Sequence, residues 1–143
     1  MNNILEVKNL KKSYNTVQGE IEAIKDITFS LKENEILGIV GSSGCGKSTL
    51  LSILSNLEQP TDGLINYKID NPKIGYMMQS DALFPWLTIL DNALLGLKIE
   101  NNLTKENIEY VKNLLETYGL KDFMKKYPES LSGGMKQRVA CIR

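Results

Sequence analysis

Apolar and polar residues alternate over residues 4–10, which is the pattern of a strand with one buried face. The alternation continues briefly at 12–14, and short apolar segments at 21–24 and 27–31 predict two further strands. A run of apolar residues that favour β structure follows at 36–40 and predicts another strand. The first part of the chain is therefore expected to form a cluster of strands.

The second part of the chain changes from strand patterns to helix patterns. Short strands are predicted at 64–67 and 74–78, and leucines at helical spacing then predict a helix over 88–97. Thr104 is a suitable N-cap for a further helix that runs to Tyr118. Helices are therefore expected to dominate the rest of the chain.

The C-terminal residues predict a short helix and then a longer one. Gly119 would end the preceding helix, and a short helix is predicted at 122–126 before Pro128. The segment 130–134 opens a last helix with an apolar face, which consists of Met135, Val139 and Ile142. Because this pattern continues to Arg143 without a glycine, a proline or a polar turn, we expect the chain to be truncated there.

A glycine-rich loop joins the apolar run at 36–40 to a helical pattern over 47–55. Its sequence is Gly41-Ser42-Ser43-Gly44-Cys45-Gly46-Lys47-Ser48-Thr49. Glycines let the backbone approach an anion closely, and the first N–H groups of the following helix have no partner within the helix. Lys47 would add a mobile positive charge, and the Ser48 hydroxyl would ligate Mg²⁺. A glycine-rich turn without function is the alternative, but the strand before the loop and the helix after it favour phosphate binding.

Charge and composition exclude several classes of function. The chain has 143 residues, enough for one domain with its own core, and its 17 basic and 17 acidic residues cancel. A neutral chain has no bulk attraction to nucleic acid, so DNA and RNA are not the expected partners. Histidine is absent, which removes the commonest general base near neutral pH and any histidine-ligated metal.

The cysteines and the apolar runs indicate the compartment. Cys45 and Cys141 lack the spacing of a metal site and are expected to be free thiols in a reducing compartment. No apolar run is as long as a membrane span, and the first residues do not form a signal peptide. We therefore expect a cytosolic protein whose contact with a membrane goes through a partner.

A second glycine motif, Leu131-Ser132-Gly133-Gly134-Met135-Lys136-Gln137-Arg138, opens the last predicted helix. It has two interpretations. The glycines leave N–H groups free at a helix start, which is typical of an anion site. Alternatively, the serine is an ordinary N-cap before a loose helix start. The spacing alone does not decide between them.

The two glycine motifs, with Gln79 at the end of a predicted strand between them, resemble the nucleotide-binding domain of ATP-binding cassette (ABC) transporters. By this resemblance, 41–49 is the Walker A loop, Gln79 is the Q-loop glutamine and 131–138 is the family signature. Tyr14 matches the aromatic residue that stacks on adenine. The segment Leu83-Phe84-Pro85-Trp86-Leu87-Thr88, followed by Asp91-Asn92, is similar to the importer ATPases for nitrate, sulfonate and taurine.

The resemblance implies an α/β fold. Its parts would be a P-loop NTPase core with an N-terminal antiparallel β region, and a helical subdomain, incomplete at the C-terminus. Residues 1–79 would form the β-rich P-loop part. Residues 80–143 would form the Q-loop and the helical subdomain through the signature helix.

The resemblance also implies roles for single residues. Lys47 and the loop amides would hold the phosphates of ATP, while Ser48 and Gln79 would position Mg²⁺ and the attacking water. Tyr14 would stack on adenine, with a buried tyrosine at a strand end as the alternative. In a head-to-tail homodimer, the γ phosphate bound by the partner protomer would be contacted by Ser132, Gly133 and Gly134. Cys45 would occupy a variable loop position without a chemical role.

Partners and location follow from the same resemblance. The apolar loop from Ala82 to Leu87 would contact the transmembrane permease subunits, with an ordinary buried connection as the alternative. A solute-binding protein would take part indirectly. The protein would then be a peripheral subunit on the inner face of the cell membrane, and it would drive the import of a small solute.

Part of the family pattern is absent from these residues. The family has an apolar strand that ends in Asp-Glu after the signature helix, and later a switch histidine. Asp91 precedes the signature and is followed by Asn92, so we interpret it as an ordinary helix residue. Without a general base the chain is expected to bind nucleotide without hydrolysing it. Rival interpretations are a non-transport ABC ATPase acting on ribosomes or DNA, a P-loop phosphotransferase, and a non-catalytic binding fragment.

Overall fold

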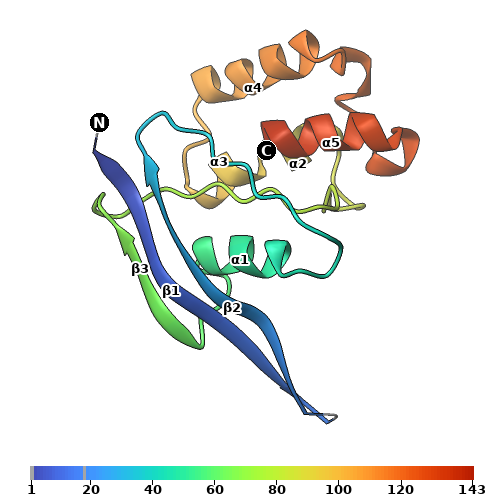
Figure 1. Ribbon diagram of the computed structural model, residues 1–143. Helices are drawn as coiled ribbons and strands as arrows, with labels where there is room; N and C mark the ends of the chain where they lie inside the picture. Colours follow the sequence, from blue (N-terminus) through green and yellow to red (C-terminus); the bar gives the residue numbers. More distant parts are fainter. Residues whose placement is uncertain (1, 18) are drawn as a thin grey trace. The chain divides into compact units, whose positions relative to one another are not determined.

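The computed structural model describes residues 2–17 and 19–143 (Figure 1). The chain forms two compact units, of which the first ends at Tyr76 and the second runs from Met77 to Arg143. Among the described elements, the strands and helix α1 lie in the first unit, and the remaining helices lie in the second.

The first unit contains a three-stranded antiparallel sheet with the strand order β2-β1-β3. β1 spans Asn3–Thr16, β2 spans Gly19–Lys32 and β3 spans Asp62–Tyr67. The two short strands predicted at 21–24 and 27–31 are therefore a single strand. β1 pairs with β2 on both sides of the polar residues 25–26 that separate these segments. The pairing with β1 therefore keeps these polar residues in the strand.

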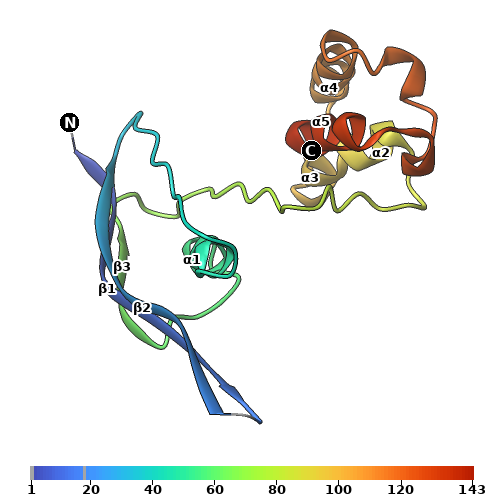
Figure 2. The ribbon, with the colours of Figure 1, turned by 45° about the vertical axis from the view of Figure 1, so that its right-hand side comes forward.

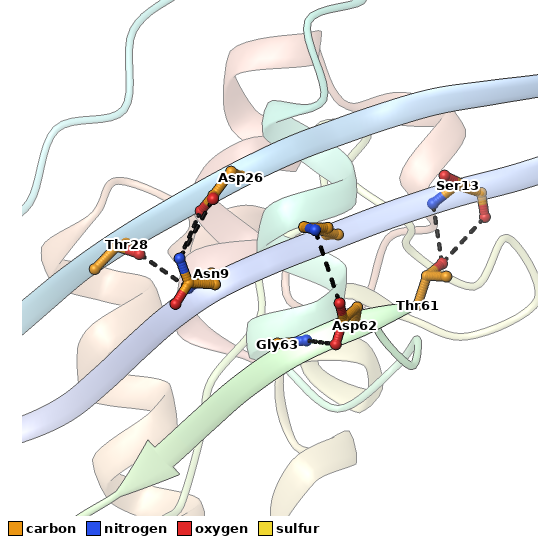
Figure 3. A network of polar contacts seen from close by, with 8 residues as sticks. Asn9, Ser13, Asp26, Thr28, Thr61, Asp62 and Gly63 are labelled. Carbon is orange, nitrogen blue, oxygen red and sulfur yellow. Dashed lines mark hydrogen bonds and ion pairs between the residues drawn. The ribbon is translucent and has the colours of Figure 1, made fainter.

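A bulge in β1 lies at Asn9, where the pairing with both neighbouring strands changes register. Asn9 has φ 47°, and its N–H donates to Thr28 Oγ1 at 2.9 Å (Figure 3). On the β3 side the backbone approaches closely, because a Cβ on Gly63 would lie 2.5 Å from the Asn9 carbonyl oxygen. Glycine at position 63 therefore allows β3 to pair with the bulged strand.

Helix α1, Lys47–Leu54, covers one face of this sheet (Figure 2). Its buried side chains Leu50 and Ile53 pack with apolar residues of the sheet, which include Leu5, Val7, Leu10 and Ile24. The helix predicted over 47–55 is confirmed, and it ends one residue earlier. Its packing fixes the end of the glycine-rich loop that precedes it.

Two predicted strands do not form. The segments 36–40 and 74–78 contain no strand residues, and Ile36 and Val40 are each 96% exposed. A strand needs a neighbour that completes its ladder of backbone hydrogen bonds. Within the described residues, neither segment has such a neighbour. The apolar sequence was therefore not sufficient for these two predictions, which are wrong.

The second unit is a cluster of helices. α2 spans Ile89–Ala93, α3 spans Leu95–Ile99, α4 spans Lys105–Thr117 and α5 spans Gly133–Ile142. Turns of 3-10 helix lie at Lys121–Phe123 (η1) and Pro128–Ser130 (η2). The helix predicted over 88–97 is interrupted at Leu94, and the one predicted at 122–126 is only the turn η1. The core of this unit contains Ile89, Ala93, Val111, Leu115, Leu120 and Val139.

Local signals set the ends of α4. The Thr104 hydroxyl accepts a hydrogen bond from the Asn107 N–H at 3.1 Å, which confirms the predicted N-cap. Gly119 has φ +72°, the left-handed conformation that commonly follows a helix. No helix within the described ranges is both long and apolar enough to cross a membrane.

Candidate functional site

The glycine-rich loop owes its shape to two glycines with left-handed backbone. Gly44 has φ +78° and Gly46 has φ +89°. A Cβ on Gly46 would lie 2.4 Å from the Ala23 carbonyl oxygen of β2, whereas a Cβ on Gly44 would meet nothing within 4 Å. The lack of a side chain at Gly46 therefore allows the loop to lie close to the sheet. The space around Gly44 is open.

The start of α1 presents free hydrogen-bond donors. Gly46 is the N-cap, so no side chain caps the helix, and Ser48 is exposed. Within the part of the chain that the structure describes, the N–H groups of Gly44, Gly46 and Lys47 have no partner. Free N–H groups at the positive end of a helix attract anions, so this loop has the chemistry of a phosphate site.

The Lys47 side chain forms hydrogen bonds to the backbone of its own loop. Its ammonium group donates to the carbonyl oxygens of Gly41 at 2.9 Å and Ser42 at 2.6 Å. The Cys45 sulfur lies 3.6 Å from the same nitrogen, and the Cys45 side chain is exposed. The positive charge thus lies at the Gly41 and Ser42 carbonyl oxygens, within the same loop as the free N–H groups.

The described residues contain no cluster of three or more His, Cys, Asp or Glu side chains suited to a metal ion. Ser48 and Thr49 follow Lys47 on α1, and the Ser48 hydroxyl is exposed next to the anion site. Mg²⁺ commonly takes only one or two protein ligands and completes its shell with phosphate oxygens and water. The donor set therefore fits Mg²⁺ that arrives with a nucleotide.

Tyr14 lies near the end of β1 with 36% of its surface exposed. The Lys12 ammonium lies 4.9 Å from the centroid of its ring. The neighbouring Tyr14 hydroxyl, together with the Lys12 ammonium, holds the pKa of Glu58 below its ordinary value of 4.5. Glu58 therefore remains ionised at neutral pH.

Gln79 and the second glycine motif lie in the second unit. Gln79 is exposed, and its backbone carbonyl accepts a hydrogen bond from the Gln137 side chain of α5 at 3.2 Å. The Ser132 hydroxyl accepts from the Met135 N–H at 3.4 Å and caps α5. Gly133 and Gly134 are exposed, and a Cβ on either would meet nothing within 4 Å. The motif is thus a capped helix start with an open outer side.

The loop before α2 exposes aromatic side chains. Trp86 is 70% exposed, and its ring centroid lies 5.1 Å from that of Phe84. The loop is held by Asn92, which is fully buried and hydrogen-bonds to the backbone of Phe84, Leu87 and Thr88. The sequence motifs assign Asn92 no such structural role. The signal that could have indicated it is the polarity of Asn92 between Ile89 and Ala93 on an apolar helix face.

Comparison with known proteins places the chain in a family. The sequence pattern described as "ABC transporter" matches residues 24–143. The chain belongs to the ABC transporter family. It is 44% identical to YtlC, an ABC transporter ATP-binding protein of Bacillus subtilis, over 97% of this chain and 55% of that protein. It is 38% identical to NrtD, a nitrate import ATP-binding protein of Synechocystis, over 97% of this chain and 54% of that protein.

The chain spans about half the length of the curated ABC relatives it matches. Other relatives are named for the import of taurine or aliphatic sulfonates, and one for the release of lipoproteins. Among solved structures, the dimeric ABC protein MJ0796 bound to ADP and Pi has a TM-score of 0.84 at 32% identity, over 96% of this chain and 67% of that chain. The expected ABC ATPase fold class is thereby confirmed.

Proposed function

We propose that this ABC chain binds ATP with Mg²⁺ at the loop 41–49. The observation that carries the proposal is the set of backbone N–H groups at the start of α1 that have no partner among the described residues, in the loop whose carbonyl oxygens bind the Lys47 ammonium. The N–H groups would bind the phosphate oxygens, and Lys47 would exchange its contacts with Gly41 and Ser42 for the β and γ phosphates. Tyr14 would stack on the adenine.

The metal and the attacking water would be held by Ser48 and Gln79. Ser48 would offer one hydroxyl ligand, and the phosphate oxygens and water would complete the shell. Bound Mg²⁺ neutralises charge on the phosphate oxygens. Gln79 would supply its side-chain oxygen from the Q-loop segment. In this proposal residues 1–79 form the P-loop part, and 80–143 form the Q-loop and helical subdomain.

The signature motif is proposed to act on a second copy of the chain. Ser132, Gly133 and Gly134 would contact the γ phosphate bound by the partner protomer in a head-to-tail dimer. The open outer side of these glycines supports this role, as do the Gly133 and Gly134 N–H groups, which have no hydrogen-bond partner among the residues that the structure describes. The dimeric state of the similar MJ0796 structure supports it as well.

The transport role of the complete protein is a further part of the proposal. The exposed loop with Phe84 and Trp86 would bind transmembrane permease subunits at the inner face of the membrane. The names of relatives favour import of a small solute such as nitrate, sulfonate or taurine. One relative named for lipoprotein release leaves an exporting role as the second candidate.

Hydrolysis requires a general base that we do not find in these 143 residues. These 143 residues contain no histidine and no apolar segment that ends in Asp-Glu. General acid-base help is worth about 10²- to 10⁴-fold in rate. We therefore propose that this chain binds ATP, and that turnover requires a general base supplied by residues other than these.

The test is Mg²⁺-ATP binding and turnover by this chain and its Lys47→Ala variant. Lys11→Ala is the matched control, because Lys11 is a partly exposed lysine of the same unit whose ammonium forms an ion pair with Asp62, at 3.8 Å. We expect binding by the chain and the control, none by Lys47→Ala, and no turnover by any of them. Turnover abolished by Lys47→Ala would show that a base is present after all, and unchanged binding by Lys47→Ala would overturn the site.

A further inference from the structure

A lysine, a tyrosine and a glutamate meet near the end of β1. The Lys12 ammonium lies 4.9 Å from the Tyr14 ring centroid and 3.1 Å from Glu58 Oε1. It also donates a hydrogen bond to the Gln59 carbonyl oxygen at 2.8 Å. Only 14% of the Lys12 side chain is exposed. Lys12 is therefore a fixed cation, in contrast to the more exposed Lys11 beside it.

Lys12 and Tyr14 point to the same side of β1, because residues two apart in a strand share a face. Their partners Glu58 and Gln59 belong to the turn that follows α1. The strand is fastened to this turn a second time, because Thr61 accepts a hydrogen bond from the Ser13 N–H at 3.0 Å (Figure 3). The tyrosine is thus tied to the segment that leaves the phosphate-loop helix.

These contacts restrict the Tyr14 ring. A cation is attracted to the negative face of an aromatic ring, so Lys12 occupies one of the two faces. Glu58 fixes the cation, because its Oε1 lies 3.1 Å from the Lys12 ammonium. The remaining exposed surface of Tyr14 is then available to a flat group such as a nucleobase. A ring held in its binding orientation loses less freedom when the base arrives.

We propose that Lys12 and Glu58 are positioning residues that hold the Tyr14 ring for stacking on the adenine of ATP. The inference rests on the proposed function, in which Tyr14 binds the base and the loop 41–49 binds the phosphates. A merely structural role, in which Lys12 only fastens β1 to the turn after α1, would affect the whole unit. The two roles predict different effects on the affinity for a ligand that lacks a nucleobase.

The experiment compares the affinities of this chain for Mg²⁺-ATP and for Mg²⁺-tripolyphosphate, which has the phosphates alone. We expect Lys12→Met to weaken ATP binding about threefold, the size of one cation–π contact, with tripolyphosphate binding unchanged. Tyr14→Ala should weaken ATP binding about tenfold or more, again without effect on tripolyphosphate. The double variant should be no weaker than Tyr14→Ala alone, because Lys12 acts through the ring.

Three variants control the test. Lys11→Met removes the neighbouring lysine on the opposite face of β1 and should leave both affinities unchanged. Lys12→Arg keeps the cation and should restore most of the ATP affinity. Glu58→Gln removes the charge that fixes Lys12 and should weaken ATP binding as much as Lys12→Met does. This variant gives an independent result if Lys12→Met does not fold.

The possible outcomes separate the inference from the proposed function. The positioning role would be overturned if Lys12→Met and Glu58→Gln lost equal affinity for both ligands, or lost none for either. Additive losses in the double variant would overturn it as well. The proposed contact between Tyr14 and adenine would then still stand. If Tyr14→Ala binds ATP as well as the parent chain does, then the proposed contact with adenine fails and the inference fails with it.

Discussion

Asn92→Ala is the substitution with the clearest expected cost in the second unit. The Asn92 side chain is fully buried and accepts a hydrogen bond from the Phe84 N–H at 2.8 Å. Its amide nitrogen donates to the carbonyl oxygens of Phe84, Leu87 and Thr88 at 3.0 to 3.1 Å. Each such bond contributes about 0.5–1.5 kcal/mol to stability, and partners left unpaired add to the loss. We therefore expect Asn92→Ala to lower the free energy of unfolding of this unit by about 3 kcal/mol.

The assay is a urea titration followed by tryptophan fluorescence. Trp86 is the only tryptophan of the chain and lies in the loop that Asn92 holds, so its emission reports on this unit. Asn113→Ala is the matched control, since Asn113 is an exposed asparagine on α4, and it should change stability by less than about 0.5 kcal/mol. If Asn92→Ala loses less than about 1 kcal/mol, then the four bonds do not hold the loop as the geometry indicates.

Three further changes test the first unit. Gly46→Ala would place a Cβ 2.4 Å from the Ala23 carbonyl oxygen at φ +89°, so we expect a loss of about 2 kcal/mol in urea titrations followed by circular dichroism, together with loss of ATP binding. Burial raises the pKa of Tyr67 above its ordinary value of 10.0. The folded state favours the neutral phenol, so this stabilisation is complete below pH 10 and is lost as the pH rises through the raised pKa. Urea titrations on either side of pH 10 should show this fall in the free energy of unfolding, and Tyr67→Phe should not show it. Ile36→Lys combined with Val40→Lys changes side chains that are 96% exposed, so stability should stay within about 0.5 kcal/mol while light scattering shows less aggregation. A clear loss of stability in that variant would show that these side chains are buried in solution.

The helices of the second unit were predictable because their signals are local. Thr104 and Gly119 act within a few residues of the helix ends, and the apolar stripe of α4 follows from its own sequence. The strand predicted at 36–40 failed for the opposite reason. Its formation depends on a partner strand elsewhere in the chain, and the sequence of the segment carries no information about whether that partner is present.

The same distinction holds at the candidate site. The spacing of Gly44, Gly46 and Lys47 dictates a backbone conformation, so the loop could be predicted from the sequence. The environment of Tyr14 could not be predicted, because Lys12 donates a hydrogen bond to a carbonyl oxygen 47 residues further along the chain. Contacts of this kind depend on how α1 and its following turn pack on the sheet, which is a property of the folded unit.

The way the loop is supported has a consequence for its affinity. On its C-terminal side, Gly46 fits against β2 and α1 is packed on the sheet. On its N-terminal side, the segment 36–40 makes no backbone hydrogen bond to any residue that the structure describes. The Gly41 and Ser42 carbonyl oxygens that bind Lys47 follow directly after this segment. Any strand that pairs with 36–40 would therefore order the loop before ATP arrives, and the affinity of this chain would be the lower limit for a protein in which that pairing is made.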